Sequence, residues 1–285
     1  MHSAQELVSH VEALASLPTV YQRIREQLDS PDGSVIEVAR LVSADPALTV
    51  RLLRLVNSAL YGYGGQVDTV NRAVQILGLQ QVHDLVLAMS VSAVFSGIQP
   101  ERMEMGRFWR GSVMCALAAR TIAQGCGLPS AERLFVIGLL ADLGHLVMYQ
   151  TVPALAAEAQ NSADRGEEAL HMAEQRIVGC DYAEVGATLM DHWRLPPLFA
   201  EVVGAQIVPR LGGDHSFDAA ILHVASALVQ ADRRGEASSA AAERIAPSVW
   251  SQLNMSPESL SRIREEAELN LAAYVSLFFP SLKIR

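Results

Sequence analysis

Apolar side chains recur at helical spacing along most of the chain. After Asp45, for example, Leu48, Leu52 and Leu55 follow one another three or four residues apart, which is the spacing of one helix face. Asp45 and Pro46 mark the start of this segment, because an aspartate N-cap followed by proline is a common helix beginning. No segment shows convincing strand alternation, so we expect an all-α fold. The predicted helices span residues 19–28, 35–42, 46–56, 70–77, 82–89, 108–124, 134–150, 153–163, 167–178, 181–193, 197–206, 219–231 and 256–274.

The most hydrophobic segment, residues 134–150, has apolar side chains on all sides of a helical wheel. Such a helix belongs in the core of a protein or in a membrane. A membrane span needs about 18 nearly uninterrupted apolar residues, whereas this segment carries the ionisable residues Asp142 and His145. We therefore predict the central helix of a soluble domain. Asp142 and His145 are three residues apart, so they share one face of that helix, where metal ligands could be placed.

Two segments interrupt the helical pattern. Residues 96–105 contain Gly97 and Pro100 and break the periodicity. They are the predicted boundary between an N-terminal half, residues 1–100, and a C-terminal half, residues 101–285. Residues 233–241 are polar or small and predict a mobile loop.

Composition and charge exclude some classes of function. The formal net charge of −9 argues against a protein that binds nucleic acid or an anionic membrane by bulk electrostatics. The three cysteines are odd in number and show no CxxC spacing, which favours buried thiols in a reducing cytoplasm. The N-terminus has no basic stretch followed by an apolar stretch, so we expect no signal peptide and a cytoplasmic protein.

Several polar residues allow both a structural and a functional interpretation. Asn57 and Ser58 could contact a ligand, but such residues more often satisfy backbone groups where a helix ends. His145 could add a metal ligand, but a polar contact inside the helix bundle is the commoner role. His83 is expected to face solvent, opposite the apolar face of its helix.

Spaced motifs run through both halves of the chain. The first half contains Asp45-Pro46-Ala47-Leu48, Asn57-Ser58-Ala59, Tyr61 and Ala73-x-x-Ile76-Leu77-Gly78. The second half contains Phe108-Trp109-Arg110, Gly138-Leu139-Leu140, Ala183-Glu184-Val185-Gly186 and Trp193-x-Leu195-Pro196. In this order, over residues 14–232, they resemble the HDOD family, relatives of the HD-domain metal phosphohydrolases. The resemblance implies a family-specific helical bundle followed by an HD-like bundle, and a role in bacterial signal transduction without an established catalytic activity.

The resemblance also indicates which metal ligands are missing. In HD-type proteins a His-Asp pair on the central helix joins histidines from neighbouring helices to hold a divalent metal. Here the pair reads Ala141-Asp142, and Gly111 and Tyr182 occupy positions where relatives often carry histidine. The remaining positions of the vestigial site are Ala205, Gln206, His223 and Ser226, of which only the third is a histidine. Hydrolytic metal sites need several His or carboxylate ligands and an open position, so we expect no metal and no cofactor.

The leading hypothesis is a non-catalytic regulatory module that acts through contact with another signalling protein. Two alternatives are a metal-dependent phosphohydrolase of nucleotides or phosphodiesters, and a module that binds a small ligand such as a nucleotide in the old pocket. Asp45, Pro46, Asn57, Ser58 and Tyr61 are candidates for an interaction or structural motif.

The vacated metal site is expected to close. Protein interiors are packed to near-crystal density, so an empty hole should not persist, and the ring of Tyr182 could occupy the space. A buried, unpaired carboxylate is costly. We therefore expect Asp142 to accept a hydrogen bond from Tyr182, His145 or His223.

Overall fold

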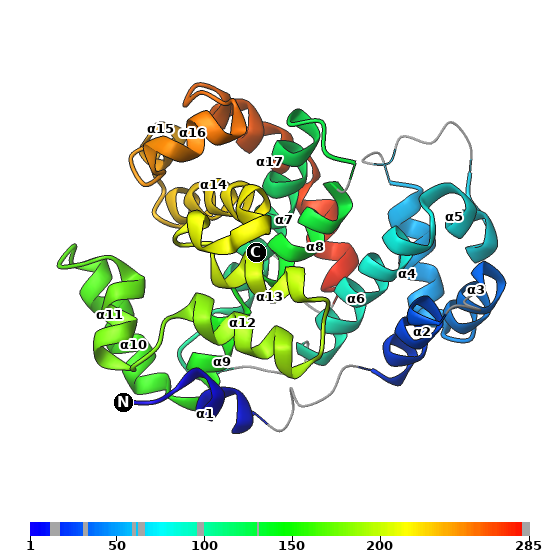
Figure 1. Cartoon of the computed structure of the whole chain (residues 1–285), viewed down its shortest axis with the longest axis horizontal. Helices are drawn as coiled ribbons and strands as arrows, with labels where there is room; N and C mark the ends of the chain where they lie inside the picture. Colours follow the sequence, from blue (N-terminus) through cyan, green and yellow to red (C-terminus); the bar gives the residue numbers. More distant parts are fainter. Residues whose placement is uncertain are drawn as a thin grey trace. The chain divides into compact units, whose positions relative to one another are not determined.

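The structure is a computed structural model that describes residues 1–11, 18–30, 34–58, 61, 66–95, 100–129 and 131–280 (Figure 1). All regular elements of these residues are helices, and no strand occurs among them. The predicted all-α fold is therefore confirmed. Ser130, Ala59 and the glycine-rich residues 62–65 lie outside the described residues.

The chain forms two compact units, each described by itself. Unit 1 comprises Met1–Ala15 and Ile98–Leu271, and unit 2 comprises Ser16–Gly97 and Ala272–Arg285. The internal boundary lies close to the expected one at residue 100, but the two ends of the chain are exchanged between the expected halves. The N-terminus belongs to unit 1 because α1 (Ala4–Ser9) packs against other helices of that unit, and the His2 amide donates a hydrogen bond to the Val178 carbonyl at 2.7 Å.

Five helices make up most of unit 2. They are α2 (Thr19–Asp29), α3 (Val35–Ser43), α4 (Pro46–Val56), α5 (Val70–Leu77) and α6 (Leu79–Phe95). Asp45 caps α4, since its side chain accepts a hydrogen bond from the Leu48 amide at 3.0 Å. The Asn57 side chain joins the end of α4 to the following loop: it donates to the Val67 carbonyl at 2.7 Å and accepts from the Val67 amide at 2.8 Å. Asn57 thus fastens two backbone segments together, and the Ser58 carbonyl accepts from the Tyr61 amide at 3.1 Å.

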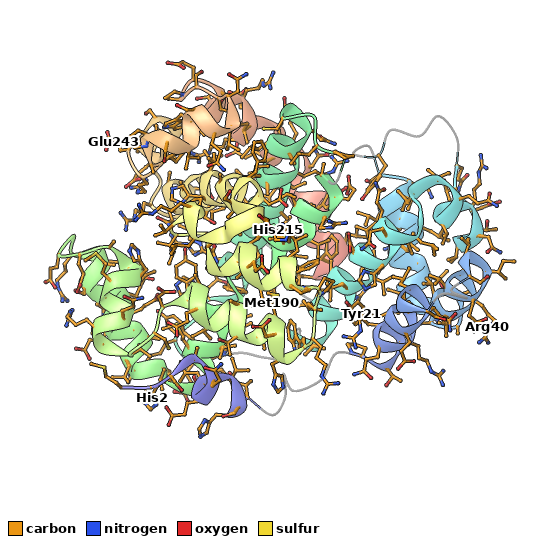
Figure 2. All side chains as sticks on the ribbon, viewed as in Figure 1. His2, Tyr21, Arg40, Met190, His215 and Glu243 are labelled. Atoms are coloured by element: carbon orange, nitrogen blue, oxygen red, sulfur yellow. The ribbon has the colours of Figure 1, made fainter. Side chains whose placement is uncertain are left out.

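His83 is buried and does not face solvent as expected. Its exposed fraction is 2%, its Nδ1 lies 3.1 Å from Asp84 Oδ1, and its ring centroid lies 5.1 Å from that of Tyr21. The prediction is wrong because α2, α4 and α5 all pack on α6 and bury both sides of it. Figure 2 contrasts the buried Tyr21 with Arg40 of α3, whose side chain is exposed.

Unit 1 is built around α7 (Met105–Gly125). This helix packs along α8 (Ala131–Leu140) and α14 (Ser216–Arg233), and most of its residues are buried. The other helices of the unit include α9 (Leu143–Thr151), α10 (Pro153–Asp164), α11 (Leu170–Ile177), α12 (Tyr182–His192), α13 (Pro197–Gly204), the 3-10 helix η2 (Pro209–His215), α15 (Ser238–Ala242) and α16 (Pro247–Leu253). The last helix, α17 (Ser259–Phe278), continues from unit 1 into unit 2.

The predicted central helix is in fact two helices. α8 ends at Leu140 and α9 begins at Leu143, with Ala141 and Asp142 in a turn between them. Hydrophobic periodicity does not locate this break because the apolar residues continue through it. Together the two helices form a stretch long and apolar enough to cross a membrane, but 78% of that window is buried inside the protein. Among the described residues, the bent pair α5–α6 is the other candidate.

Candidate functional site

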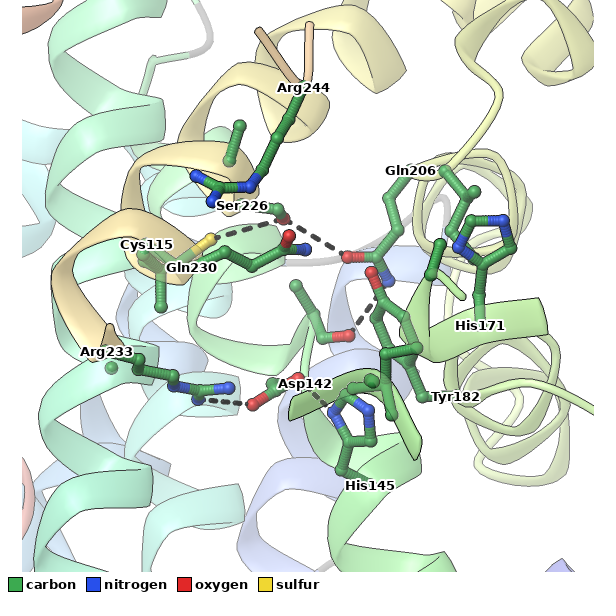
Figure 3. A pocket seen from close by; sticks show the side chains of 18 of the residues that line it. Cys115, Asp142, His145, His171, Tyr182, Gln206, Ser226, Gln230, Arg233 and Arg244 are labelled. Carbon is green, nitrogen blue, oxygen red and sulfur yellow. Dashed lines mark hydrogen bonds and ion pairs between the residues drawn. The ribbon is translucent and has the colours of Figure 1, made fainter. Parts of the chain in front are cut away.

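Most of the positions predicted for a vestigial metal site line an open cavity of about 690 Å³ in unit 1 (Figure 3). α7, the α8–α9 turn, α12, α14 and the connection between α10 and α11 all contribute to its walls. The structure brings together eight of the nine predicted positions, namely Gly111, Ala141, Asp142, His145, Tyr182, Gln206, His223 and Ser226. Ala205 is buried beside Gln206 but does not line the cavity. The expectation that no hole persists is therefore wrong.

Asp142 lies between two cationic partners. Its Oδ1 accepts a hydrogen bond from His145 Nδ1 at 2.5 Å, and its Oδ2 accepts from Arg233 Nη2 at 2.6 Å. Burial raises the pKa of Asp142, but the charges and hydrogen bonds of Arg233 and His145 outweigh burial and hold that pKa well below its usual range. The carboxylate is therefore ionised at neutral pH, with both oxygens engaged. His145 was one of the three expected donors, whereas Arg233 was not foreseen.

Arg233 reaches Asp142 because residue 111 is glycine. Arg233 is the last residue of α14, and its guanidinium occupies the space beside Gly111 on α7. A Cβ atom at residue 111 would lie only 2.8 Å from Arg233 Nη2. Residue 233 was predicted to begin a loop, but α14 ends with it, and α15 occupies the end of that predicted loop, whereas residues 234–237 are not helical. The role of Arg233 was missed because small polar residues do not reveal a partner that lies far away along the chain.

His145 continues the ion-pair network toward Glu174. Its Nε2 lies 2.9 Å from Glu174 Oε1, which is an ion-pair distance although the N–H does not point along that line. Burial lowers the pKa of His145, but Asp142 and Glu174 outweigh burial and raise it to about 10. His145 is therefore protonated at neutral pH. Glu174 is 2% exposed, and its other oxygen accepts a hydrogen bond from the Tyr182 amide at 3.0 Å.

Tyr182 covers His145 and leaves the cavity open. The two rings are stacked, with centroids 4.2 Å apart and planes 13° from parallel. Gly144 permits this arrangement, because a Cβ at that residue would lie 1.9 Å from the Tyr182 carbonyl oxygen. The close approach of α9 and α12 therefore sets the position of the Tyr182 ring.

A second set of polar groups lines the opposite part of the cavity. Gln206 Nε2 donates to the Ala141 carbonyl at 2.9 Å, and its Oε1 accepts from the Ser226 hydroxyl at 3.3 Å. His223 Nδ1 donates to the Gln206 carbonyl at 2.8 Å, and burial lowers the pKa of His223. His223 is therefore neutral, and its Nε2 is buried.

The residues present do not fit a divalent metal. Among the described residues, no group of three or more His, Cys, Asp or Glu side chains is placed to hold one. Both Asp142 oxygens are already bonded to cations, and Nδ1 of His223 is committed to a backbone carbonyl. Gly111 and Ala141 offer no ligand. The arrangement supplies a positive charge from the protein itself, through the Arg233 guanidinium.

Arg233 and Glu174 are residues of the Asp142 network that sequence reasoning missed. The available signal for Arg233 was the coincidence of a glycine at residue 111 and a basic residue at the end of a long apolar helix. No sequence pattern pointed to Glu174, because a glutamate in a helix that carries both polar and apolar residues is normally exposed.

Comparisons with known proteins agree with this architecture. The HDOD domain family model matches residues 14–209. A crystal structure from Shewanella amazonensis SB2B, of a protein provisionally assigned as a phosphohydrolase, is 25% identical, covers 99% of both chains and has a TM-score of 0.73. An HDOD domain protein of unknown function from Geobacter sulfurreducens is 21% identical, covers 97% of both chains and has a TM-score of 0.76.

A Treponema pallidum (strain Nichols) protein, described as uncharacterized, is 24% identical over 194 residues. That alignment covers 68% of this chain and 37% of the Treponema protein, so this chain matches only about a third of that relative. The family model covers more than half of the chain. The chain belongs to the HDOD family.

Proposed function

We propose that this protein is a non-catalytic regulatory module of bacterial signal transduction that acts in the cytoplasm through contact with another protein. The observation that carries the proposal is the Asp142 carboxylate bonded on one side by Arg233 and on the other by His145. The Arg233 guanidinium and the protonated His145 ring bind both oxygens of the carboxylate that a metal ion would need as a ligand.

Metal hydrolysis at this site would require that network to be dismantled. A hydrolytic metal generates its nucleophile from a bound water and needs several protein ligands. Asp142 would have to give up Arg233, and Gly111, Ala141 and Tyr182 would replace no lost histidine. The ion pairs instead favour a rigid, inactive centre around which the helices of unit 1 are fixed.

Contact with a partner is supported by exposed apolar side chains on unit 2. Ile36 is 74% exposed and Val35 is 41% exposed in the first turn of α3, and Val50 is 48% exposed on α4, which packs on α3. Contiguous exposed apolar patches mark protein interaction surfaces, and we propose that these three side chains form one.

The competing function is a metal-dependent phosphohydrolase. It is favoured by the likeness to the Shewanella amazonensis protein, which is provisionally assigned that activity. Tag-free protein should be assayed with bis(p-nitrophenyl) phosphate and with cyclic dinucleotides, in Mn²⁺, Mg²⁺ or Fe²⁺, beside Asp142→Ala. We expect no metal-dependent turnover above that of the variant. Turnover abolished by Asp142→Ala would refute the proposal.

The interaction is tested by crosslinking and affinity capture from the native cell, with Ile36→Asp and Val50→Asp beside the parent. Arg262→Glu is the control, because the Arg262 side chain is 72% exposed and lies on α17 in unit 1 rather than on α3 or α4. We expect one signalling protein to be captured by the parent and by the control and lost in both aspartate variants. Equal capture by all four proteins would contradict the proposed surface.

A further inference from the structure

The cavity has the size and the polar lining of a binding site. Its volume of about 690 Å³ lies within the roughly 300–1,000 Å³ of small-molecule pockets. The polar residues of its lining include Gln206, Ser226 and Gln230, whose side chains can hydrogen-bond an uncharged polar part of a ligand.

The rim of the cavity is cationic although the chain as a whole is acidic. Four arginines line the cavity, namely Arg107, Arg233, Arg234 and Arg244. With protonated His145 they make five cationic groups among the lining residues, beside the lining carboxylates Asp142, Asp164 and Glu168. Glu174 and Glu236, outside the lining, pair with His145 and Arg244. The chain carries a formal net charge of −9, so this concentration of cationic side chains is a local feature.

Two of the four guanidiniums carry charge that no carboxylate neutralises. Arg233 pairs with Asp142, and Arg244 pairs with Glu236 at 2.5 Å. Arg107 instead donates to the Arg233 carbonyl, and among the described residues neither Arg107 nor Arg234 forms an ion pair with a carboxylate. Both of these arginines line the same cavity, and Arg234 follows directly in the chain on the residue whose carbonyl Arg107 contacts. Arg107 and Arg234 are exposed and accessible from solvent.

We propose that this cavity binds a small polar molecule that carries a phosphate monoester, held by Arg107 and Arg234 at the rim. A phosphate monoester carries a charge of about −1.5 to −2 at neutral pH, which matches the two free guanidiniums. Arginine forms bidentate hydrogen bonds with phosphate oxygens, whereas a neutral ligand would leave both charges unused. The inference rests on the proposed non-catalytic role in one respect: the ligand is bound and released without hydrolysis.

Isothermal titration of the tag-free full chain tests this, with AMP, glucose 6-phosphate and inorganic phosphate as anionic probes and adenosine as the neutral probe. The test variant is Arg107→Gln/Arg234→Gln. The matched control is Arg262→Gln, which removes an arginine with a 72% exposed side chain outside the cavity. Both sites are on the surface, so circular dichroism and melting temperature should report folded proteins.

We expect one-to-one binding of a phosphate monoester, weakened about tenfold or more in the double variant and by added salt, and unchanged in the control. Binding of adenosine as tight as that of AMP, or equal loss in the control, would overturn the assignment. So would no saturable binding of any anionic probe up to about 10 mM, well above a millimolar Kd. Phosphate release from a bound monoester that requires metal would support the pocket and refute the non-catalytic function. Absence of binding with no turnover would refute only the pocket.

Discussion

Replacing Asp142 by asparagine removes the negative charge that joins Arg233 to His145. The side chains of Asp142, His145 and Arg233 are 16%, 11% and 30% exposed, so the network is largely shielded from water. Removal of one partner from a buried ion pair costs roughly 3–5 kcal/mol, because the other charge remains without compensation. Arg233 can regain some water and His145 keeps Glu174, so we place the loss of unfolding free energy for Asp142→Asn at about 3 kcal/mol.

The assay is urea denaturation followed by tryptophan fluorescence. All three tryptophans, Trp109, Trp193 and Trp250, lie in unit 1, so the signal reports on the unit that contains the site. Asp164→Asn is the matched control: Asp164 also lines the cavity but is exposed, and its partner is Gln160 within the same helix. We expect the control to stay within about 0.5 kcal/mol of the parent.

A double-mutant cycle isolates the pair itself. Arg233→Gln alone and Asp142→Asn alone should each destabilise unit 1, and the double variant should cost less than the sum by about 2 kcal/mol. The reasoning is refuted if Asp142→Asn changes the unfolding free energy by less than about 1 kcal/mol, or if the two substitutions are additive. It is also refuted if a chelator destabilises the parent as much as Asp142→Asn does, because a metal would then hold the carboxylate.

Three further predictions concern the same centre. The pKa of His145 is raised to about 10 in the folded protein, so its contribution to stability is complete below its unfolded pKa of about 6.5 and is lost as pH rises toward 10. The unfolding free energy should therefore fall by up to about 1.4 kcal/mol per pH unit between pH 7 and 8.5. This fall should vanish in His145→Asn. Gly144→Ala should cost about 3 kcal/mol or prevent folding, because its Cβ would meet the Tyr182 carbonyl at 1.9 Å, whereas Gly125→Ala, with nothing within 4 Å, should be nearly neutral in the same melts. Gly111→Ala should displace Arg233 and cost about 1–2 kcal/mol in urea melts, an effect that should disappear in the Asp142→Asn background.

The helices and the family were predictable because their signals are local. Periodic apolar positions and caps such as Asp45 mark the helices, and the spaced motifs mark the family. The contact between His145 and Asp142 follows from a separation of three residues. The burial of His83 was not predictable, because periodicity on one face does not reveal that neighbouring helices cover the other.

The site was predictable as a set of positions but not as a network. Arg233 lies 91 residues from Asp142 along the chain, and no local pattern links the two. The open cavity was missed for a related reason: Tyr182 was expected to fill the space, but its ring is held on His145 by the close approach at Gly144.

The central claim is that Arg233 has replaced the metal as the cation beside Asp142. Its most direct test is elemental analysis of protein purified without a histidine tag after incubation with Mn²⁺, Fe²⁺ and Zn²⁺ and removal of free metal. The account predicts far less than one metal ion per chain, with the same result for Asp142→Ala. One or more ions per chain in the parent, lost in Asp142→Ala, would contradict it.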